Sequence, residues 1–239
     1  MLRFAVLAMT LTLAVPAVAE ARAETDSELL DRAVKGVETF YNKVTDFKAD
    51  FTQEVRRAHL VRPLKKSGHV FFQRPGEGQA KMRWDYTQPD KVYYVSDGEV
   101  LWSYEVATKQ AVKMGVKDSE LYDSLKFLFG QGDLRGSFDI KLGAQQDGLV
   151  GIVLTPKSGQ QDFKSLTLYT KLGTWEISKT ELVDPLDNVS TIAFTSPKYD
   201  PLKPDGFKFT PPKGAQIQDL THPQPQAPLK PEPTVPKTP

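Results

Sequence analysis

The stretch that decides the fold is residues 68–105, GHVFFQRPGEGQAKMRWDYTQPDKVYYVSDGEVLWSYE. Turn residues divide it into four short runs in which apolar and polar side chains alternate. Such alternation is typical of strands with one buried face, and short connections favour an antiparallel meander. The dipeptide Asp97-Gly98 predicts a two-residue hairpin loop that pairs Val95 with Val100. The sequence therefore predicts a sheet with one strongly aromatic face.

Arg74 continues the alternation of Val70 and Phe72, so its side chain is predicted at the edge of the same apolar face of the strand. An unpaired charge on an apolar face is costly, so its guanidinium needs acceptors. Carbonyl oxygens at a helix C-terminus or a turn are suitable acceptors. The alternative is that Arg74, which precedes Pro75, lies at the strand end and extends to solvent.

The rest of the chain predicts two helices and further strands. Residues 25–44 have helical apolar spacing, and Thr25 and Glu28 have the spacing of a capping box. Residues 118–129 predict a second helix, and the basic residues 56–66 predict a solvated turn. Further strands are predicted at 47–55, 110–114, 137–143, 148–155, 163–170, 174–183, 189–196 and 207–209. About eleven strands in hairpin order predict a large antiparallel sheet that curls or closes.

The composition and motif content of the chain argue against several classes of function. The chain has 239 residues and a net charge of +1, which favours one domain and argues against a nucleic-acid binder or a polybasic membrane-surface protein. Without cysteine it has no disulfide, no thiolate chemistry and no sulfur-ligated metal. Its three histidines are scattered, and it contains neither a nucleophile elbow nor a P-loop. We therefore expect no enzyme, no metal and no cofactor.

The two ends of the chain differ from its middle. Residues 1–23 predict a signal peptide, with cleavage after Ala19 or Ala23 and export to the periplasm of a Gram-negative bacterium. A single domain is predicted over residues 24–219. Residues 220–239 are rich in proline and predict an extended, disordered tail. The alternative for the tail is a spacer that contacts a partner or the cell wall.

Ordered blocks of sequence resemble the periplasmic lipoprotein carrier (LolA) family. They are DFTQEV from Asp50, Arg74-Pro75, RWDY from Arg83, QPD from Gln88, VSDG from Val95, LWSY from Leu101 and FKFTPPKG from Phe207. The resemblance implies an incomplete antiparallel β-barrel of about eleven strands, with helices as a lid over a hydrophobic cavity. It also implies that acylated lipoproteins are received from an inner-membrane ABC-type lipoprotein-releasing complex and passed to an outer-membrane acceptor.

The aromatic face then has two interpretations, an ordinary core or the wall of a cavity that accepts an acyl chain. We favour the cavity. The residues predicted to line it are Val70, Phe72, Met82, Trp84, Tyr86, Tyr93, Val95, Val100, Trp102 and Tyr104 from the sheet, and Val37, Tyr41, Leu121, Leu125 and Leu128 from the lid. The resemblance makes Arg74 a lid latch, with carbonyl acceptors near Tyr41 and at Leu128-Phe129.

The leading hypothesis is thus a non-enzymatic, monomeric carrier that binds no nucleic acid. The alternative is a lipid- or lipoprotein-sensing module of an envelope-stress system. A periplasmic hydrolase would need a clustered nucleophile and base, which the sequence does not offer.

Overall fold

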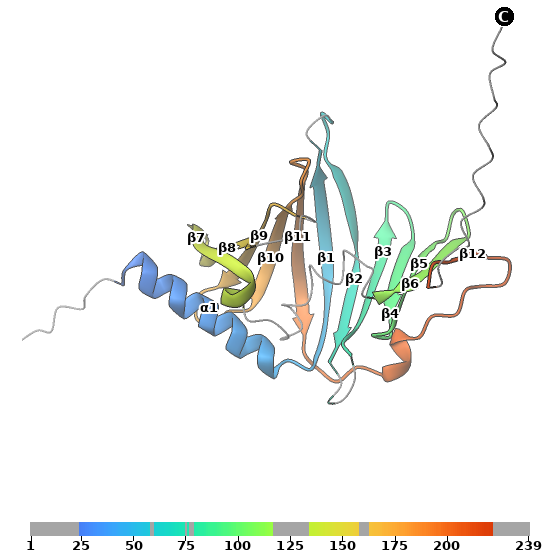
Figure 1. Ribbon diagram of the computed structural model, residues 1–239, viewed down its shortest axis with the longest axis horizontal. Coiled ribbons are helices and arrows are strands. Elements are labelled where there is room, and N and C mark those ends of the chain that lie inside the picture. Colours follow the sequence, from blue (N-terminus) through green and yellow to red (C-terminus); the bar gives the residue numbers. More distant parts are fainter. Residues whose placement is uncertain are drawn as a thin grey trace, which may run out of the picture.

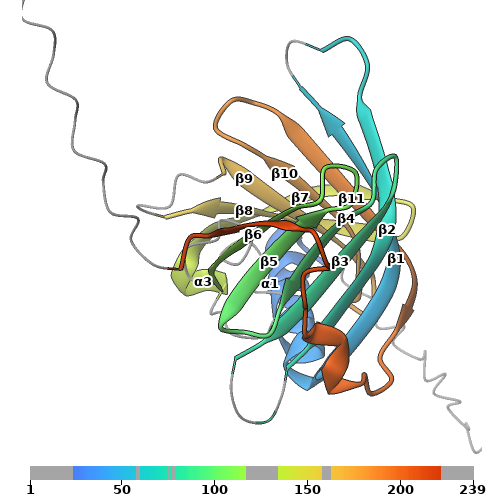
Figure 2. The same ribbon diagram turned by 90° about the vertical axis from the view of Figure 1, so that its right-hand side faces the viewer.

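The computed structural model describes residues 24–57, 60–74, 76, 79–116, 134–157 and 163–221. Its main feature is one twelve-stranded open sheet in the order β12-β6-β5-β4-β3-β2-β1-β11-β10-β9-β8-β7. Every neighbouring pair is antiparallel except β12 and β6. The strands are β1 (Asp46–Arg56), β2 (Leu64–Gln73), β3 (Lys81–Gln88), β4 (Val92–Ser96), β5 (Val100–Glu105), β6 (Gln110–Gly115), β7 (Phe138–Gln146), β8 (Leu149–Pro156), β9 (Ser165–Lys171), β10 (Ile177–Val183), β11 (Val189–Lys198) and β12 (Gln216–Asp219). The sheet curves strongly, as Figures 1 and 2 show.

Helix α1 (Asp26–Lys43) lies inside the curve, against the half of the sheet formed by β7–β10 (Figure 1). Its capping box is present, because Thr25 Oγ1 accepts from Glu28 N and the Glu28 carboxylate accepts from Thr25 N at 2.9 Å. The helix contributes Leu29, Ala33, Val34, Val37 and Tyr41 to a core cluster with strands β8, β9 and β10. The predicted helix over residues 25–44 is confirmed. Among the described residues no helix is long and apolar enough to cross a bilayer.

α1 has a glycine, Gly36, in its interior, where the side chain of Trp175 packs directly against the helix backbone. Trp175 lies in the turn between β9 and β10. A Cβ at Gly36 would lie 2.3 Å from the indole, so only glycine permits this contact. Trp175 has a φ of 63°, and the Arg32 guanidinium lies 5.4 Å from the centre of its ring. Residues 174–183 were predicted to form one strand, but the strand begins at Ile177 because Trp175 turns back onto the helix.

The second core cluster occupies the same face of the sheet on its other half. Its buried members are Ala49, Phe51, Val70, Phe72, Ala80, Met82, Trp84, Leu101 and Val116. Phe194 of β11 packs against both clusters and joins them. We call the face that carries both clusters the inner face.

The opposite face, here the outer face, is covered on β3–β6 by the C-terminal segment (Figure 2). This segment contains the 3-10 helix η2 (Pro204–Phe207) and β12. Phe209 packs against Trp102 and Tyr104, and the Arg83 guanidinium donates to the carbonyl oxygen of Gly206 at 3.0 Å. The prediction of a strand at 207–209 is therefore wrong, and the last strand is β12, which pairs in parallel with β6.

The connection between β4 and β5 also differs from the prediction. Ser96 pairs with Leu101 and Val95 with Trp102, so the loop holds four residues instead of two. The Asp97 carboxylate accepts from the backbone N–H groups of Glu99 and Val100, both at 3.0 Å, which stabilises the longer loop. The predicted pairing of Val95 with Val100 is wrong.

We predict that Gly68→Ala destabilises the fold by about 1–3 kcal/mol, the usual cost of overpacking. Gly68 stands at a β-bulge between β2 and β3, where an added Cβ would lie 2.0 Å from the carbonyl oxygen of Asp85. Urea unfolding would measure the free energy of unfolding. Gly206→Ala is the matched control, because nothing lies within 4 Å of its Cβ position. Equal free energies of unfolding for the two variants would contradict this account.

Candidate functional site

A small apolar cavity lies between the C-terminal end of α1 and the inner face of the sheet. Its volume is about 40 Å³. Its lining is almost wholly hydrocarbon and aromatic, and comes from both halves of the sheet. The lining residues are Tyr41, Val44, Phe47, Val70, Phe71, Phe72, Met82, Trp84, Ile177 and Phe194.

Five of the residues predicted for the cavity line it, namely Tyr41, Val70, Phe72, Met82 and Trp84. The register brings the four strand residues together, because Val70 pairs with Trp84 and Phe72 with Met82. Val37 lies one turn earlier on α1 and packs into the core cluster with β8–β10.

Tyr86 lies on the same face, farther along the strand. Its hydroxyl donates to Gln53 Oε1 at 3.0 Å, and Gln53 Nε2 donates to Ser190 Oγ at 2.9 Å. Burial raises the pKa of the Tyr86 phenol, with a smaller contribution from Tyr94. A polar layer therefore follows the apolar cavity along β1, β3 and β11.

The other five predicted sheet residues, Tyr93, Val95, Val100, Trp102 and Tyr104, lie on the outer face. Trp84 pairs with Tyr94 and Met82 with Ser96, which leaves Tyr93 and Val95 on the opposite side of the sheet. The placement of these five residues in the cavity is wrong. Their apolar character has another cause, since Phe209 of the C-terminal segment packs against Trp102 and Tyr104, and Tyr93 stacks on Tyr104. Tyr94 and Leu101 take their place on the inner face.

The lining residues that the sequence prediction missed are Val44, Phe47, Phe71, Ile177 and Phe194. Phe47 and Phe194 lie in strands far apart in the chain, and the pairing of β1 with β11 brings them to one site. Period-two patterns at 47–51 and 192–194 were the available signal, but they do not reveal which strands are neighbours.

Arg74 binds the C-terminal end of α1. Its Nη2 lies 2.6 Å from the carbonyl oxygen of Asn42, 2.9 Å from that of Val44 and 3.3 Å from that of Tyr41. Carbonyl groups in the last turn of a helix lack intrahelical partners and carry its negative dipole end. A guanidinium cation there makes charge-assisted hydrogen bonds. The half-buried Arg74 therefore fastens the end of α1 to the end of β2.

Tyr41 fixes the same end of α1 to the other half of the sheet. Its hydroxyl accepts a hydrogen bond from Ile177 N at 3.1 Å. Burial raises the pKa of this phenol well above its ordinary value, so the hydroxyl stays neutral. Phe40 packs edge-on against both Tyr41 and Tyr199.

Asp46 organises the backbone beneath this site. Its Oδ1 accepts from Gln73 Nε2 at 2.9 Å and from Leu202 N at 3.0 Å. Burial raises the pKa of the carboxyl, but these hydrogen bonds outweigh burial and hold the pKa below its ordinary value. The start of β1, the end of β2 and the segment after β11 are thereby joined beside Arg74.

The remaining predicted lid residues, Leu121, Leu125, Leu128 and Phe129, lie outside the described residues. In the part of the chain that the structure describes, no cluster of three or more ligating side chains is placed to hold a metal ion. The site therefore offers an apolar surface for contact, bordered by the Arg74-bound C-terminal end of α1.

We predict that Tyr41→Phe lowers the free energy of unfolding by about 1–3 kcal/mol, because the buried Ile177 N–H loses its acceptor. The ring, and therefore the packing, is retained. Tyr169→Phe is the control, since the Tyr169 ring lies on the other side of the sheet beside Lys179 Nζ. We expect it to change the free energy of unfolding by less than about 0.5 kcal/mol. Equal losses in the two variants in urea unfolding would remove the assigned role of Tyr41.

Comparison with known proteins gives a consistent answer. Residues 42–210 match the family model described as outer membrane lipoprotein carrier protein LolA. The outer-membrane lipoprotein carrier protein of Cupriavidus necator is 31% identical over 189 residues, which are 77% of this chain and 87% of that protein. The protein of the same name from Salmonella paratyphi A is 31% identical over 189 residues, or 78% and 88% of the two chains.

Among solved structures, an uncharacterized conserved protein from Thermus thermophilus has a TM-score of 0.51 at 16% identity. The match covers 79% of this chain and 98% of that one, and it supports the fold alone. The match to the family model spans well over half of the sequence. The chain therefore belongs to the LolA family, a family of non-enzymatic outer-membrane lipoprotein carriers.

Proposed function

We propose that this protein is a periplasmic carrier that shields the acyl chains of lipoproteins and moves them from the inner to the outer membrane. The observation that carries the proposal is the apolar cavity closed by the Arg74-bound end of α1, in a chain of the LolA family. Each buried methylene is worth about 0.8 kcal/mol, so roughly 12 kcal/mol opposes carrying a sixteen-carbon chain bare through water.

The closed cavity requires a conformational change before cargo binds. Its volume of about 40 Å³ compares with about 300–1,000 Å³ for ligand pockets. Shifting a two-state lid from almost fully closed to almost fully open needs about 5.5 kcal/mol of differential binding. Burial of an acyl chain provides about twice that, so cargo binding is strong enough to open the lid.

The partners follow from the same proposal. Proteins of the LolA family are periplasmic, and residues 1–23 of this chain are the predicted export signal. In this proposal the protein receives its cargo from an inner-membrane ABC-type releasing complex and delivers it to an outer-membrane acceptor. Both steps take place outside the cytoplasm. The carrier acts as a monomer in this proposal.

We predict that Arg74→Leu slows the release of bound lipoprotein by about tenfold or more. The apparent affinity of a carrier falls with the population of its closed state, and Arg74 stabilises that state through three carbonyl contacts. Hydrogen bonds to charged groups contribute about 1.5–3 kcal/mol, which sets the size of the effect. The measurement is loading from inner-membrane vesicles, followed by transfer to outer membranes.

Arg83→Leu is the matched control for this variant. Arg83 also donates to a backbone carbonyl, that of Gly206, but on the outer face of the sheet. We expect it to release cargo as the wild type does. If Arg74→Leu loads and delivers at the wild-type rate, Arg74 does not control the lid.

We further predict that a photoreactive phenylalanine analogue at position 94 cross-links to the acyl chain of bound cargo, whereas the same analogue at position 93 does not. Tyr94 packs against Tyr86 on the inner face, and Tyr93 stacks on Tyr104 on the outer face. Mass spectrometry of the cross-linked peptides would identify the attached lipid. Equal cross-linking at both positions would contradict the assignment of the faces.

The alternative, a sensing module, gives a different result when the protein is purified from the periplasm. A carrier co-purifies with triacylated proteins. Recovery of free lipid alone would favour the sensor.

A further inference from the structure

The tip of the hairpin formed by β1 and β2 combines exposed apolar residues with concentrated positive charge. We define the hairpin tip as the described residues 56, 57 and 60–66, which hold five Lys or Arg residues and no Asp or Glu. Val61 is fully exposed, and Leu60 and Leu64 are 45% and 40% exposed. Leu60 N donates to the carbonyl oxygen of Arg57 at 3.0 Å. The sequence predicted only a solvated turn for these basic residues.

The hairpin tip projects beyond the neighbouring strands (Figure 1). Pairing of β3 with β2 ends at Ser67 and Gln88, so residues 64–66 continue past β3. Asp46 pairs with Gln73 at one end of the hairpin and Val55 with Leu64 at the other. At about 3.3 Å per residue, the hairpin tip lies about 30 Å from the Arg74 end of the cavity.

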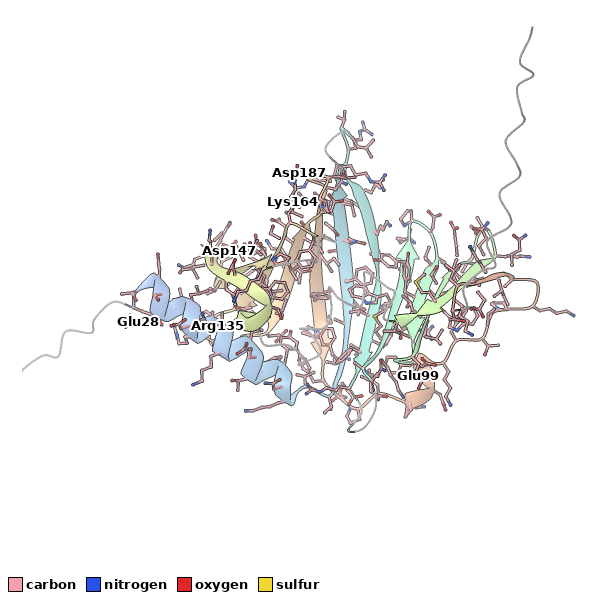
Figure 3. All side chains as sticks on the ribbon, viewed as in Figure 1. Glu28, Glu99, Arg135, Asp147, Lys164 and Asp187 are labelled. Carbon is pink, nitrogen blue, oxygen red and sulfur yellow. The ribbon has the colours of Figure 1, made fainter. Side chains whose placement is uncertain are left out.

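A further exposed apolar residue lies at the same end of the sheet. Leu186, in the turn between β10 and β11, is 75% exposed. Figure 3 labels Lys164 and Asp187 toward this end of the sheet, and these two side chains form an ion pair at 2.6 Å. The Asp187 carboxylate is therefore paired, and the Asp184 carboxylate in the same turn accepts from Leu186 N, Asn188 N and Asn188 Nδ2.

The cations of the hairpin tip are available for a partner. Arg56 pairs with Glu54 at 3.1 Å, and Lys66 Nζ lies 5.5 Å from the centre of the Tyr86 ring. Within the described residues, Arg57, Arg62 and Lys65 form no ion pair. Apolar side chains that protrude among free cations match a bilayer with anionic headgroups, which accepts both at its interface.

We propose that the hairpin tip binds the surface of an anionic phospholipid bilayer, with Leu60 and Val61 entering the interface. The proposal does not depend on cargo, because the hairpin tip lies at the end of the sheet remote from the cavity mouth. It adds a direct membrane contact to the chain, in addition to any contact with protein partners.

The test uses the full chain without lipoprotein and two kinds of vesicle. One contains phosphatidylethanolamine with phosphatidylglycerol, and the other contains phosphatidylcholine alone. We expect co-sedimentation with the anionic vesicles that weakens as salt rises. Leu60→Ser with Val61→Ser should lower the partition coefficient about tenfold or more. Arg57→Gln, Arg62→Gln and Lys65→Gln together should lower it on the order of a hundredfold.

Leu172→Ser is the matched control, since Leu172 is 52% exposed in the turn at the opposite end of β10. The chain has no cysteine, so an environment-sensitive dye on Val61→Cys labels one site. Its emission should shift to the blue with anionic vesicles, and the same dye on Leu172→Cys should not shift. Failure of the wild type to sediment, equal binding by the serine variant, or equal binding to both vesicles would overturn the proposal. None of these outcomes bears on acyl-chain carriage.

Discussion

The structure depends on the contact between the Arg74 guanidinium and the carbonyl oxygens at the end of α1. Helix geometry leaves the last carbonyl groups of α1, such as that of Asn42, without intrahelical partners, and this end of the helix lies beside the apolar cavity that Val44 lines. A cation from the end of β2 satisfies them and holds the helix down in one contact. Breaking the contact removes no buried apolar side chain, because Arg74 is only half-buried. Raising the helix end, however, also releases Tyr41 from Ile177 N and from the core cluster, so opening of the cavity draws on packing that stabilises the fold.

The alternation within each strand was predictable from the sequence, and so was α1. Thr25 and Glu28 mark the start of the helix, and each predicted strand from residue 137 to 196 has a counterpart. Trp84 and Phe72 were correctly grouped because β2 and β3 each carry a clear period-two pattern. Local pattern and hydrogen bonding determine these features, so no knowledge of distant neighbours was needed.

The predicted assignment of residues to one face of the sheet is wrong from β4 onward. Parity along a strand is a local property, but the length of each connection determines which parity continues on the same face of the next strand. The connection places Trp84 opposite Tyr94, whereas the prediction grouped Trp84 with Tyr93. Both parities of β4 are apolar, since Tyr94 packs on the inner cluster and Tyr93 stacks on Tyr104 of the outer face, which in turn packs against Phe209. A near-continuous run such as VYYV was the available signal.

The close contact of Gly36 with Trp175 divides α1 into two unequal parts. Its first part contributes Leu29, Ala33 and Val34 to the core cluster with β8–β10. The seven residues after Gly36 contribute Val37 and Tyr41 to the same cluster and end at the carbonyl acceptors of Arg74. At 1.5 Å per residue this second part is about 10 Å long. Lifting the C-terminal end of α1 must therefore draw Val37 and Tyr41 out of that cluster, or else carry the whole helix away from Trp175 as one body.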